Sequence, residues 1–316
     1  MLRAAYCRPG VIWTVEPAFL GVPGAWLAAK LTGAACWLHV QDFEIDAAFG
    51  LGMVKGNWIR MTLYRLECWL MSRCQVVSSI SRAMVERLLM RGVYRDKVII
   101  FPNWVDLGQV RPLPTEGSLR KEWEISPNRM VILYSGNIGQ KQGLELVLEV
   151  AKEFKDDRPE FLFLMVGNGA SRDWLQSEAN RQGLSNVVFK PLQPVERLSA
   201  LLATADIHLV LQRRGVADLA MPSKLAGILA AGGAAIVTAD PGTELYHTVL
   251  DNRIGYVIPP ESSDSLSQAL RKLAGDPALM NSIRKKALQY AGGHFDREII
   301  MNIVEERLDS LVANGW

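Results

Sequence analysis

The feature that most constrains the fold is a repeated alternation of short apolar runs with longer stretches of helical periodicity. Four such runs lie in the first third of the 316-residue chain, and six more begin at residue 130. Each run is apolar on both faces and too short for a buried helix, which is typical of strands in a parallel sheet covered by helices. The expected strands are residues 11–15, 35–40, 75–79, 97–101, 130–135, 161–166, 186–190, 207–212, 234–238 and 255–258.

The spacing of these runs predicts two domains of the α/β class. Residues 111–118 carry two prolines and a glycine between the two groups of strands, as an interdomain linker does. We therefore expect a first domain at residues 1–107 and a second at 108–295, with six strands making the second a complete doubly wound domain. Helical periodicity is broken at residues 292–295, and the final helix, 296–316, is expected to pack back on the first domain.

Charge and cysteine content narrow the function classes. The formal net charge is only +2, which gives no general electrostatic basis for binding nucleic acid. The four cysteines form no CxxC pair and have no histidine at metal-ligand spacing, so we expect reduced thiols and no metal site or cofactor. The sequence shows no signal peptide and no unbroken run of 18 apolar residues, which predicts a cytoplasmic protein with membrane contact only at its surface.

An anion site is expected at residues 221–233, MPSKLAGILAAGG. A Pro at the start of a small-residue helix, with Ser223 and Lys224 beside it, describes a helix whose positive end is open to an anion such as phosphate.

Three turns in the second half follow strands and carry glycine or cationic residues. The first contains Gly136, Asn137 and Lys141, the second Gly167 and Gly169, and the third Arg213. The carboxyl ends of parallel strands lie along one edge of a sheet, so these turns and the helix at 221–233 should line one crevice. Each glycine taken alone is equally typical of a plain turn, and the spacing matches neither the P-loop nor the dinucleotide fingerprint.

In the first half, His39 and Asp42 lie at the carboxyl end of the second strand, where open parallel sheets place ligand groups. They could position a sugar hydroxyl; the alternative is a hydrogen-bonded loop with a structural histidine. The expected helix at 57–74 interleaves arginines with tryptophans and leucines. That pattern suits contact with an anionic bilayer, but it is also typical of a helix that buries one face against a sheet.

Several segments together resemble the retaining family-4 glycosyltransferases of the GT-B fold, above all the bacterial branch that builds colanic acid and O-antigen polysaccharides. The segments are LHVQDFEIDAAFGLG at 38–52, FPNWVD at 101–106, YSGNIGQKQGLELVLEVA at 134–151, VGNG at 166–169 and PSKLAGILAAGG at 222–233. The resemblance implies two Rossmann-type doubly wound domains, the first on the acceptor side and incomplete. It also implies transfer of a sugar from a nucleotide diphosphate sugar to a lipid-linked or saccharide acceptor, at the inner face of the plasma membrane.

The resemblance also assigns roles. The turn with Gly136, Asn137 and Lys141 would meet the diphosphate together with Ser223 and Lys224, and Gly167 and Gly169 would lie near the base. His39 and Asp42 would face the transferred sugar and the acceptor as catalytic residues. The sequence departs from the family at two places. Leu219 and Gly227 stand where many members carry glutamates, and Asn137 stands where an arginine is common, so that Arg213 or Arg214 would supply the cation.

Members of this family normally begin with further strands, so the sequence predicts an incomplete first domain, either because the chain is part of a longer reading frame or because a partner chain completes it. The alternative function is a non-catalytic remnant that binds a nucleotide or a partner. A sugar-nucleotide epimerase of the same fold is disfavoured by the NIGQKQG and PSKL segments.

Overall fold

The structure is a computed structural model that describes residues 9–16, 21–43, 57–214 and 222–313. Its described residues form two compact units. Unit 1 contains those up to Asn103 and from Glu298 onward, and unit 2 contains those from Trp104 to Arg297.

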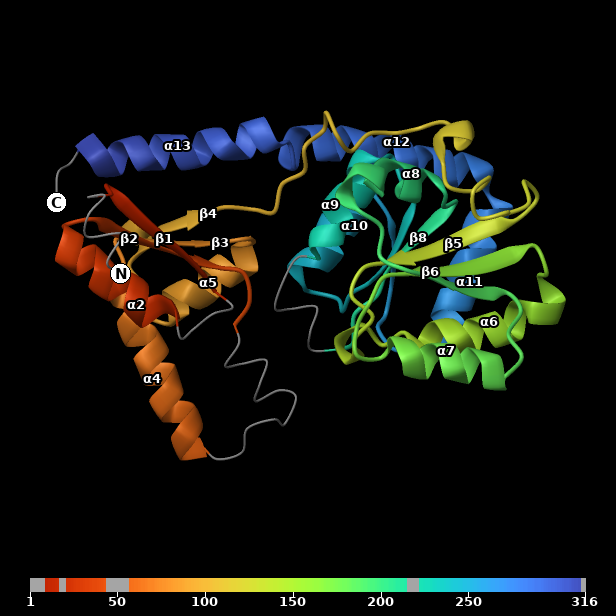
Figure 1. The fold of residues 1–316 in the computed structure, drawn as a ribbon, viewed down its shortest axis with the longest axis horizontal. Coiled ribbons are helices and arrows are strands. Elements are labelled where there is room, and N and C mark those ends of the chain that lie inside the picture. The colour runs from red at the N-terminus through yellow and green to blue at the C-terminus, as the bar shows by residue number, and fades with distance from the viewer. Residues whose placement is uncertain (1–8, 17–20, 44–56, 215–221, 314–316) are drawn as a thin grey trace. The chain divides into compact units, whose positions relative to one another are not determined.

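Unit 1 is built on a four-stranded parallel sheet with the strand order β1-β2-β3-β4. Figure 1 shows α13 along one face of this sheet and α2 and α5 on the other. The strands are β1 (Val11–Glu16), β2 (Ala35–Val40), β3 (Val76–Ser79) and β4 (Val98–Ile100), and the helices are α2 (Gly21–Thr32), α4 (Asn57–Arg73), α5 (Arg82–Met90) and α13 (Arg297–Ala313).

Alternation along β2 explains these layers, because successive side chains point to opposite faces of the sheet. Trp37 packs in a cluster with Ile300 and Val304 of α13, whereas Cys36 and Leu38 belong to a cluster that includes residues of α2, α4 and α5. Both faces are covered, so β2 is completely buried, and all of its residues except His39 are apolar. The helix α5 begins at the serine that the sequence indicates: the Ser81 hydroxyl accepts a hydrogen bond from the backbone N–H of Met84, at 3.2 Å.

Unit 2 contains six parallel strands in the order β10-β9-β8-β5-β6-β7. This order reverses between β5 and β8, and in open α/β sheets such a reversal opens a crevice at the carboxyl ends of the two strands. The strands are β5 (Met130–Ser135), β6 (Phe161–Val166), β7 (Val187–Lys190), β8 (Ile207–Val210), β9 (Ala235–Thr238) and β10 (Tyr256–Ile258).

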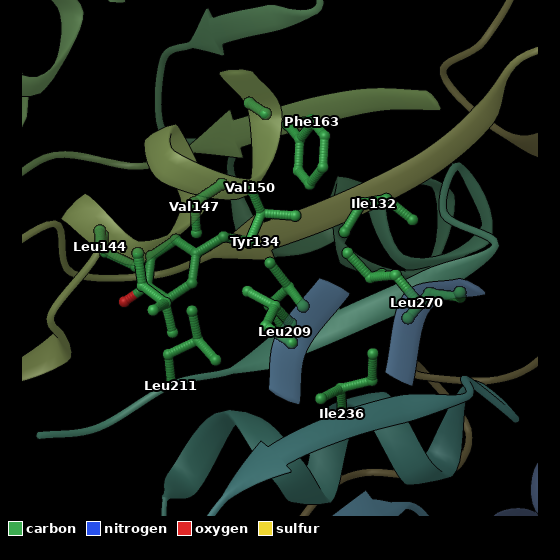
Figure 2. Packing of buried hydrophobic residues seen from close by; sticks show 14 of the residues in the cluster. Ile132, Tyr134, Leu144, Val147, Val150, Phe163, Leu209, Leu211, Ile236 and Leu270 are labelled. Atoms are coloured by element: carbon green, nitrogen blue, oxygen red, sulfur yellow. The ribbon is translucent and has the colours of Figure 1, made fainter. Parts of the chain in front are cut away.

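The core of unit 2 lies between this sheet and the helices α6, α7 and α11. Figure 2 shows its centre, where Ile132 and Tyr134 of β5 pack with Leu209 of β8 and Val147 of α6. The helices of the unit are α6 (Glu145–Asp157), α7 (Arg172–Arg181), α8 (Leu198–Ala203), α9 (Ser223–Ala230), α10 (Glu244–Asn252), α11 (Ser263–Gly275) and α12 (Pro277–His294). Short 3₁₀ turns occupy Arg95–Lys97 in unit 1 and Thr115–Gly117, Gln140–Gln142 and Val195–Arg197 in unit 2.

The ten strands that the apolar runs predict are all present, with bounds that differ by no more than two residues. The expected interruption at residues 292–295 is wrong in position. The helix α12 continues through Gly292 and Gly293 to His294, whose ring stacks on Tyr290 with centroids 4.0 Å apart, and it ends at Phe295. Pro222 lies one position earlier than expected, at the N-cap of α9 instead of in its first turn.

Candidate functional site

The turns after β5 and β6 cross each other at van der Waals distance. The backbone N–H of Gly136 donates to Val166 O at 3.0 Å, and that of Ile138 donates to Asn168 O at 2.8 Å. A Cβ placed on Gly167 would lie 1.9 Å from Gly136 O, and Gly167 has a φ of +145°. Only glycine permits this crossing, and it fixes the shape of both turns.

Gly169 is constrained in the same way. Its φ is +155°, and a Cβ there would lie 2.3 Å from Ile138 O and 2.6 Å from the Asn137 side-chain oxygen. The Tyr134 hydroxyl donates to the backbone oxygen of Asn137 at 2.6 Å. The turn that carries Gly136 and Asn137 is therefore fixed by contacts with Tyr134 of β5 and with the turn after β6.

Lys224 is the most unusual group of the crevice. Its Nζ is buried, has no hydrogen-bond partner among the described residues, and lies 3.8 Å from the centre of the Tyr134 ring. Burial lowers the pKa of this amine to about 7. A buried amine without a partner is costly, and an anion beside it would remove that cost.

The amine lies at the start of α9, beside the first turn. A Cβ on Gly136 would be 3.9 Å from Lys224 Cδ. The N-cap of α9 is Pro222, which makes no side-chain cap, and the next residue, Ser223, is exposed. The first N–H groups of a helix have no intrahelical partners and carry partial positive charge. The Lys224 amine and the first N–H groups of α9 together form a site of positive electrostatic potential.

Arg213 and Lys141 lie where the turns after β8 and β5 meet. The backbone N–H of Arg213 donates to Lys141 O at 2.9 Å. The Arg213 guanidinium donates to Gln140 O and pairs with Glu145 at 2.8 Å and Glu261 at 3.3 Å. Arg213 thus braces the turn that presents Lys141, and its charge is shared with two carboxylates. Arg214 is more exposed and lies 3.8 Å from Asp240.

His39 belongs to unit 1 and is buried there. Its Nδ1 lies 2.9 Å from Ser78 Oγ, which also accepts a hydrogen bond from Trp37 Nε1 at 2.8 Å. The imidazole packs against Phe101, with ring centroids 4.9 Å apart. Burial lowers its pKa to about 4, so the ring is neutral at physiological pH. Asp42 is half-buried and follows the same strand.

The structure thus brings most of the expected donor residues together in unit 2 and places His39 and Asp42 at the carboxyl end of β2 in unit 1. Leu219 lies outside the described residues. Sequence reasoning missed Tyr134, which looked like one more apolar strand residue, and Gln212, whose side-chain Oε1 is buried without a partner among the described residues. The described residues also contain no group of three or more His, Cys, Asp or Glu side chains that could hold a metal ion.

Comparison with known proteins agrees with this architecture. Residues 116–290 match the family model for glycosyl transferases group 1, and residues 2–104 match the glycosyl transferase 4-like domain. The chain is 37% identical over 300 residues to WcaI of Escherichia coli strain K12, a protein assigned as a colanic acid biosynthesis glycosyl transferase. That alignment covers 93% of this chain and 72% of WcaI.

Two further similarities are more distant. A glycosyltransferase of Pseudomonas aeruginosa, WbjE, is 25% identical over 258 residues, which cover 80% of this chain and 63% of WbjE. The structure of HepE from Anabaena, solved in complex with UDP and glucose, superposes with a TM-score of 0.79 at 15% identity, covering 98% of this chain and 80% of HepE. The two parallel-sheet units have the GT-B fold, and the chain belongs to the group 1 glycosyl transferases.

Proposed function

We propose that this chain transfers a sugar from a nucleotide diphosphate sugar to a saccharide or lipid-linked acceptor in the synthesis of a surface polysaccharide. The observation that carries the proposal is the buried Lys224 amine, which has no partner among the described residues and lies at the start of α9 beside the crossed glycine turns. The relationship to WcaI supports colanic acid or O-antigen type polysaccharides as the product class.

The chemistry of transfer explains why a buried amine is useful here. As the bond from the sugar to the diphosphate breaks, negative charge develops on the leaving phosphate. An ammonium and helix N–H groups already oriented toward that oxygen stabilise the charge with little reorganisation. Lys224 and Ser223 at the start of α9 supply both, and Lys141 adds a second cation from the braced turn. We extend the proposal to a retaining mechanism, which the family resemblance favours.

On the acceptor side, His39 is assigned a hydrogen-bonding role. Ser78 Oγ accepts from Trp37 Nε1 and also pairs with His39 Nδ1, which holds the imidazole in place. Because the ring is neutral, it can form a hydrogen bond with a sugar hydroxyl without adding positive charge. Asp42 would accept a hydrogen bond from a second hydroxyl.

Calorimetry with UDP and GDP tests the donor site. We expect the purified chain to bind one of the two in a 1:1 ratio, and Lys141→Ala to weaken that binding about tenfold because one phosphate contact is lost. The matched control is Lys152→Ala, on the exposed face of α6, which should leave the affinity unchanged. The proposal fails if neither nucleotide binds, or if Lys141→Ala and Lys152→Ala behave alike.

A non-catalytic, nucleotide-binding remnant is the second candidate, and Gly227 favours it. The family resemblance implies a glutamate there, whereas α9 of this chain, SKLAGILA, carries no carboxylate. Consumption of a UDP-sugar or GDP-sugar separates the two candidates. Turnover above background that is lost in His39→Ala but kept in His247→Ala, an exposed histidine of unit 2, would exclude a purely binding role.

We also propose that α4 and α2 dock on an anionic membrane surface. Exposed apolar side chains gather on these helices, where the ring of Trp69 packs edge-on against that of Trp26 with centroids 5.5 Å apart. The most exposed are Trp58 at 77% and Leu31 at 70%. Basic residues lie among them: Lys30, Arg65 and Arg73. Apolar contact with flanking cations is the pattern of an interfacial helix. No helix in the described residues is long and apolar enough to cross a membrane.

Vesicle sedimentation tests this surface. We expect binding to phosphatidylcholine vesicles that contain phosphatidylglycerol, weaker binding to phosphatidylcholine alone, and release by salt. The double variant Trp58→Ser/Met61→Ser should weaken binding about tenfold, because two exposed apolar side chains no longer enter the interface. Trp174→Ser, which removes an exposed tryptophan from unit 2, is the control. Equal loss in both variants would contradict the assignment.

A further inference from the structure

Unit 2 contains a second cleft, at the edge of the sheet opposite the donor crevice. Its volume is about 620 Å³. Asp206 and His208 lie at the beginning of β8, and Gly233 precedes β9, so the cleft is at the amino ends of the strands. The turns that carry Gly136 and Gly167 follow the carboxyl ends. The cleft is therefore separate from the donor site and within the size range of small-molecule pockets.

Positive charge exceeds negative charge in the walls of this cleft. Arg120 is neutralised locally, because it pairs with the Asp206 carboxylate at 2.5 Å and donates to two backbone oxygens. Arg284 donates to Asp206 O at 2.9 Å through a single nitrogen, and its guanidinium makes no other hydrogen bond to a described residue. Lys285 is exposed and makes no ion pair within the described part of the chain. Two adjacent cations on α12 thus border the cleft with donors to spare.

His208 adds a polar group to the floor of the cleft. It is 1% exposed, and its Nδ1 has no hydrogen-bond partner among the described residues. Burial, together with the nearby Arg284 charge, lowers its pKa to about 3, so the ring is neutral. A Cβ on Gly233 would lie 2.6 Å from the imidazole, so the glycine is what admits the ring at this place. An unsatisfied buried nitrogen is costly unless a ligand supplies its partner.

The remaining wall is apolar. Leu202 comes from α8, Leu288 from α12, and Leu113 from the segment that precedes β5, with Pro112 and Pro127 beside them. From these features we propose that the cleft binds a small organic phosphate, a phosphate monoester joined to an apolar or ring-shaped group. Arg284 and Lys285 bind the phosphate, the leucines contact the apolar group, and His208 pairs with a polar group of the ligand.

Such a ligand would contact both residues 112–115, from the segment that precedes β5, and the helix α12. Binding at this position stabilises unit 2 by mass action, and it does so without any contact with the donor crevice. Occupation of the cleft is therefore independent of the proposed transfer reaction.

Calorimetry with 1-naphthyl phosphate tests the cleft on the full chain. We expect 1:1 binding that saturating UDP and GDP leave unchanged and that Lys285→Glu weakens about tenfold or more by reversing a charge beside the phosphate. Lys286→Glu, the next residue of α12 but not part of the cleft, is the matched control. Inorganic phosphate alone and 1-naphthol alone should each bind more weakly, because each lacks one half of the ligand.

Lys285 is suited to this test because it is exposed and unpaired among the described residues, so its substitution removes the ligand contact without disturbing the fold. Displacement of 1-naphthyl phosphate by UDP or GDP would assign the binding to the donor crevice and overturn the inference. So would absence of binding, or an equal effect of Lys285→Glu and Lys286→Glu. Loss of UDP binding, by contrast, would affect only the proposed function.

Discussion

Replacement of Lys224 by methionine is expected to stabilise the protein and, in the same change, to abolish nucleotide binding. The Lys224 amine is buried against the Tyr134 ring without a hydrogen-bond partner among the described residues, and methionine has a similar length without the charge. Removal of a buried, unpaired cation relieves a desolvation cost, whereas most substitutions in a core destabilise. A variant that gains stability and loses binding identifies a residue kept for function.

The stability gained in Lys224→Met should depend on pH, and the lowered pKa of Lys224 fixes the direction of that dependence. The pKa of Lys224 is about 7 in the folded chain, against 10.5 for a free lysine. The cost of burying the amine is absent above pH 10.5, grows as the pH falls from there to about 7, and is complete below that value. At roughly 1.4 kcal/mol per unit of pKa difference, the gain in Lys224→Met is on the order of 5 kcal/mol near pH 6.

Urea unfolding of Lys224→Met between about pH 6 and about pH 9.5, with calorimetry of UDP and GDP, measures both effects. The gain in stability should shrink steadily as the pH rises, and Lys152→Met, at an exposed position, should show no such trend. The parent chain should also take up a proton when the nucleotide binds above about pH 7, because a phosphate beside Lys224 raises the pKa of the amine. A variant that is destabilised at every pH and still binds the nucleotide would remove Lys224 from the donor site.

The elements of both sheets follow from the sequence because their physical causes are local. A buried strand such as β6 needs an unbroken apolar run, and such a run is visible without any knowledge of its neighbours. The strand order of unit 2 is not local. The reversal between β5 and β8, which creates the crevice, depends on how the helices are distributed over the two faces of the sheet, and the sequence indicates it only through the Rossmann-like pattern.

The residue types of the site could be predicted better than its contacts. The glycines at 136, 167 and 169 stand where the backbone crosses, and a glycine directly after a buried strand commonly marks a turn or a close approach of two backbones. The pairing of Arg213 with Glu145 and Glu261 could not be foreseen, since these residues lie on three separate segments.

Tertiary packing also overrides the expected break at Gly292 and Gly293. Each glycine costs α12 about 1 kcal/mol relative to alanine, which the sequence alone presents as a reason for the helix to end. The side chain of Ala291 is buried in the folded chain, and the i,i+4 ring stack of His294 on Tyr290 adds a contact within the helix. The burial of Ala291 depends on tertiary packing and leaves no local signal.

Substitution of Gly167 by alanine is expected to cause the largest loss of stability in unit 2 among single-methyl changes at the turns. The added Cβ would lie 1.9 Å from Gly136 O and 3.0 Å from Gly136 C, both backbone atoms, at a φ of +145°. Neither turn can move away without breaking the hydrogen bond from Gly136 N to Val166 O. We expect a loss of more than about 3 kcal/mol in the free energy of unfolding, together with loss of nucleotide binding.

Gly242→Ala separates the steric effect from backbone strain. Gly242 also has a positive φ, +90°, but a Cβ there would meet no heavy atom within 4 Å, so the variant should lose only about 1–2 kcal/mol and keep its affinity for the nucleotide. Urea unfolding and calorimetry on the two variants measure the difference. Equal losses of unfolding free energy in the two variants would mean that the two turns can move apart to accept the added methyl group. A clearly larger loss in Gly167→Ala, with loss of nucleotide binding in that variant alone, would mean that the contact between the two turns fixes the backbone that we propose to face the diphosphate.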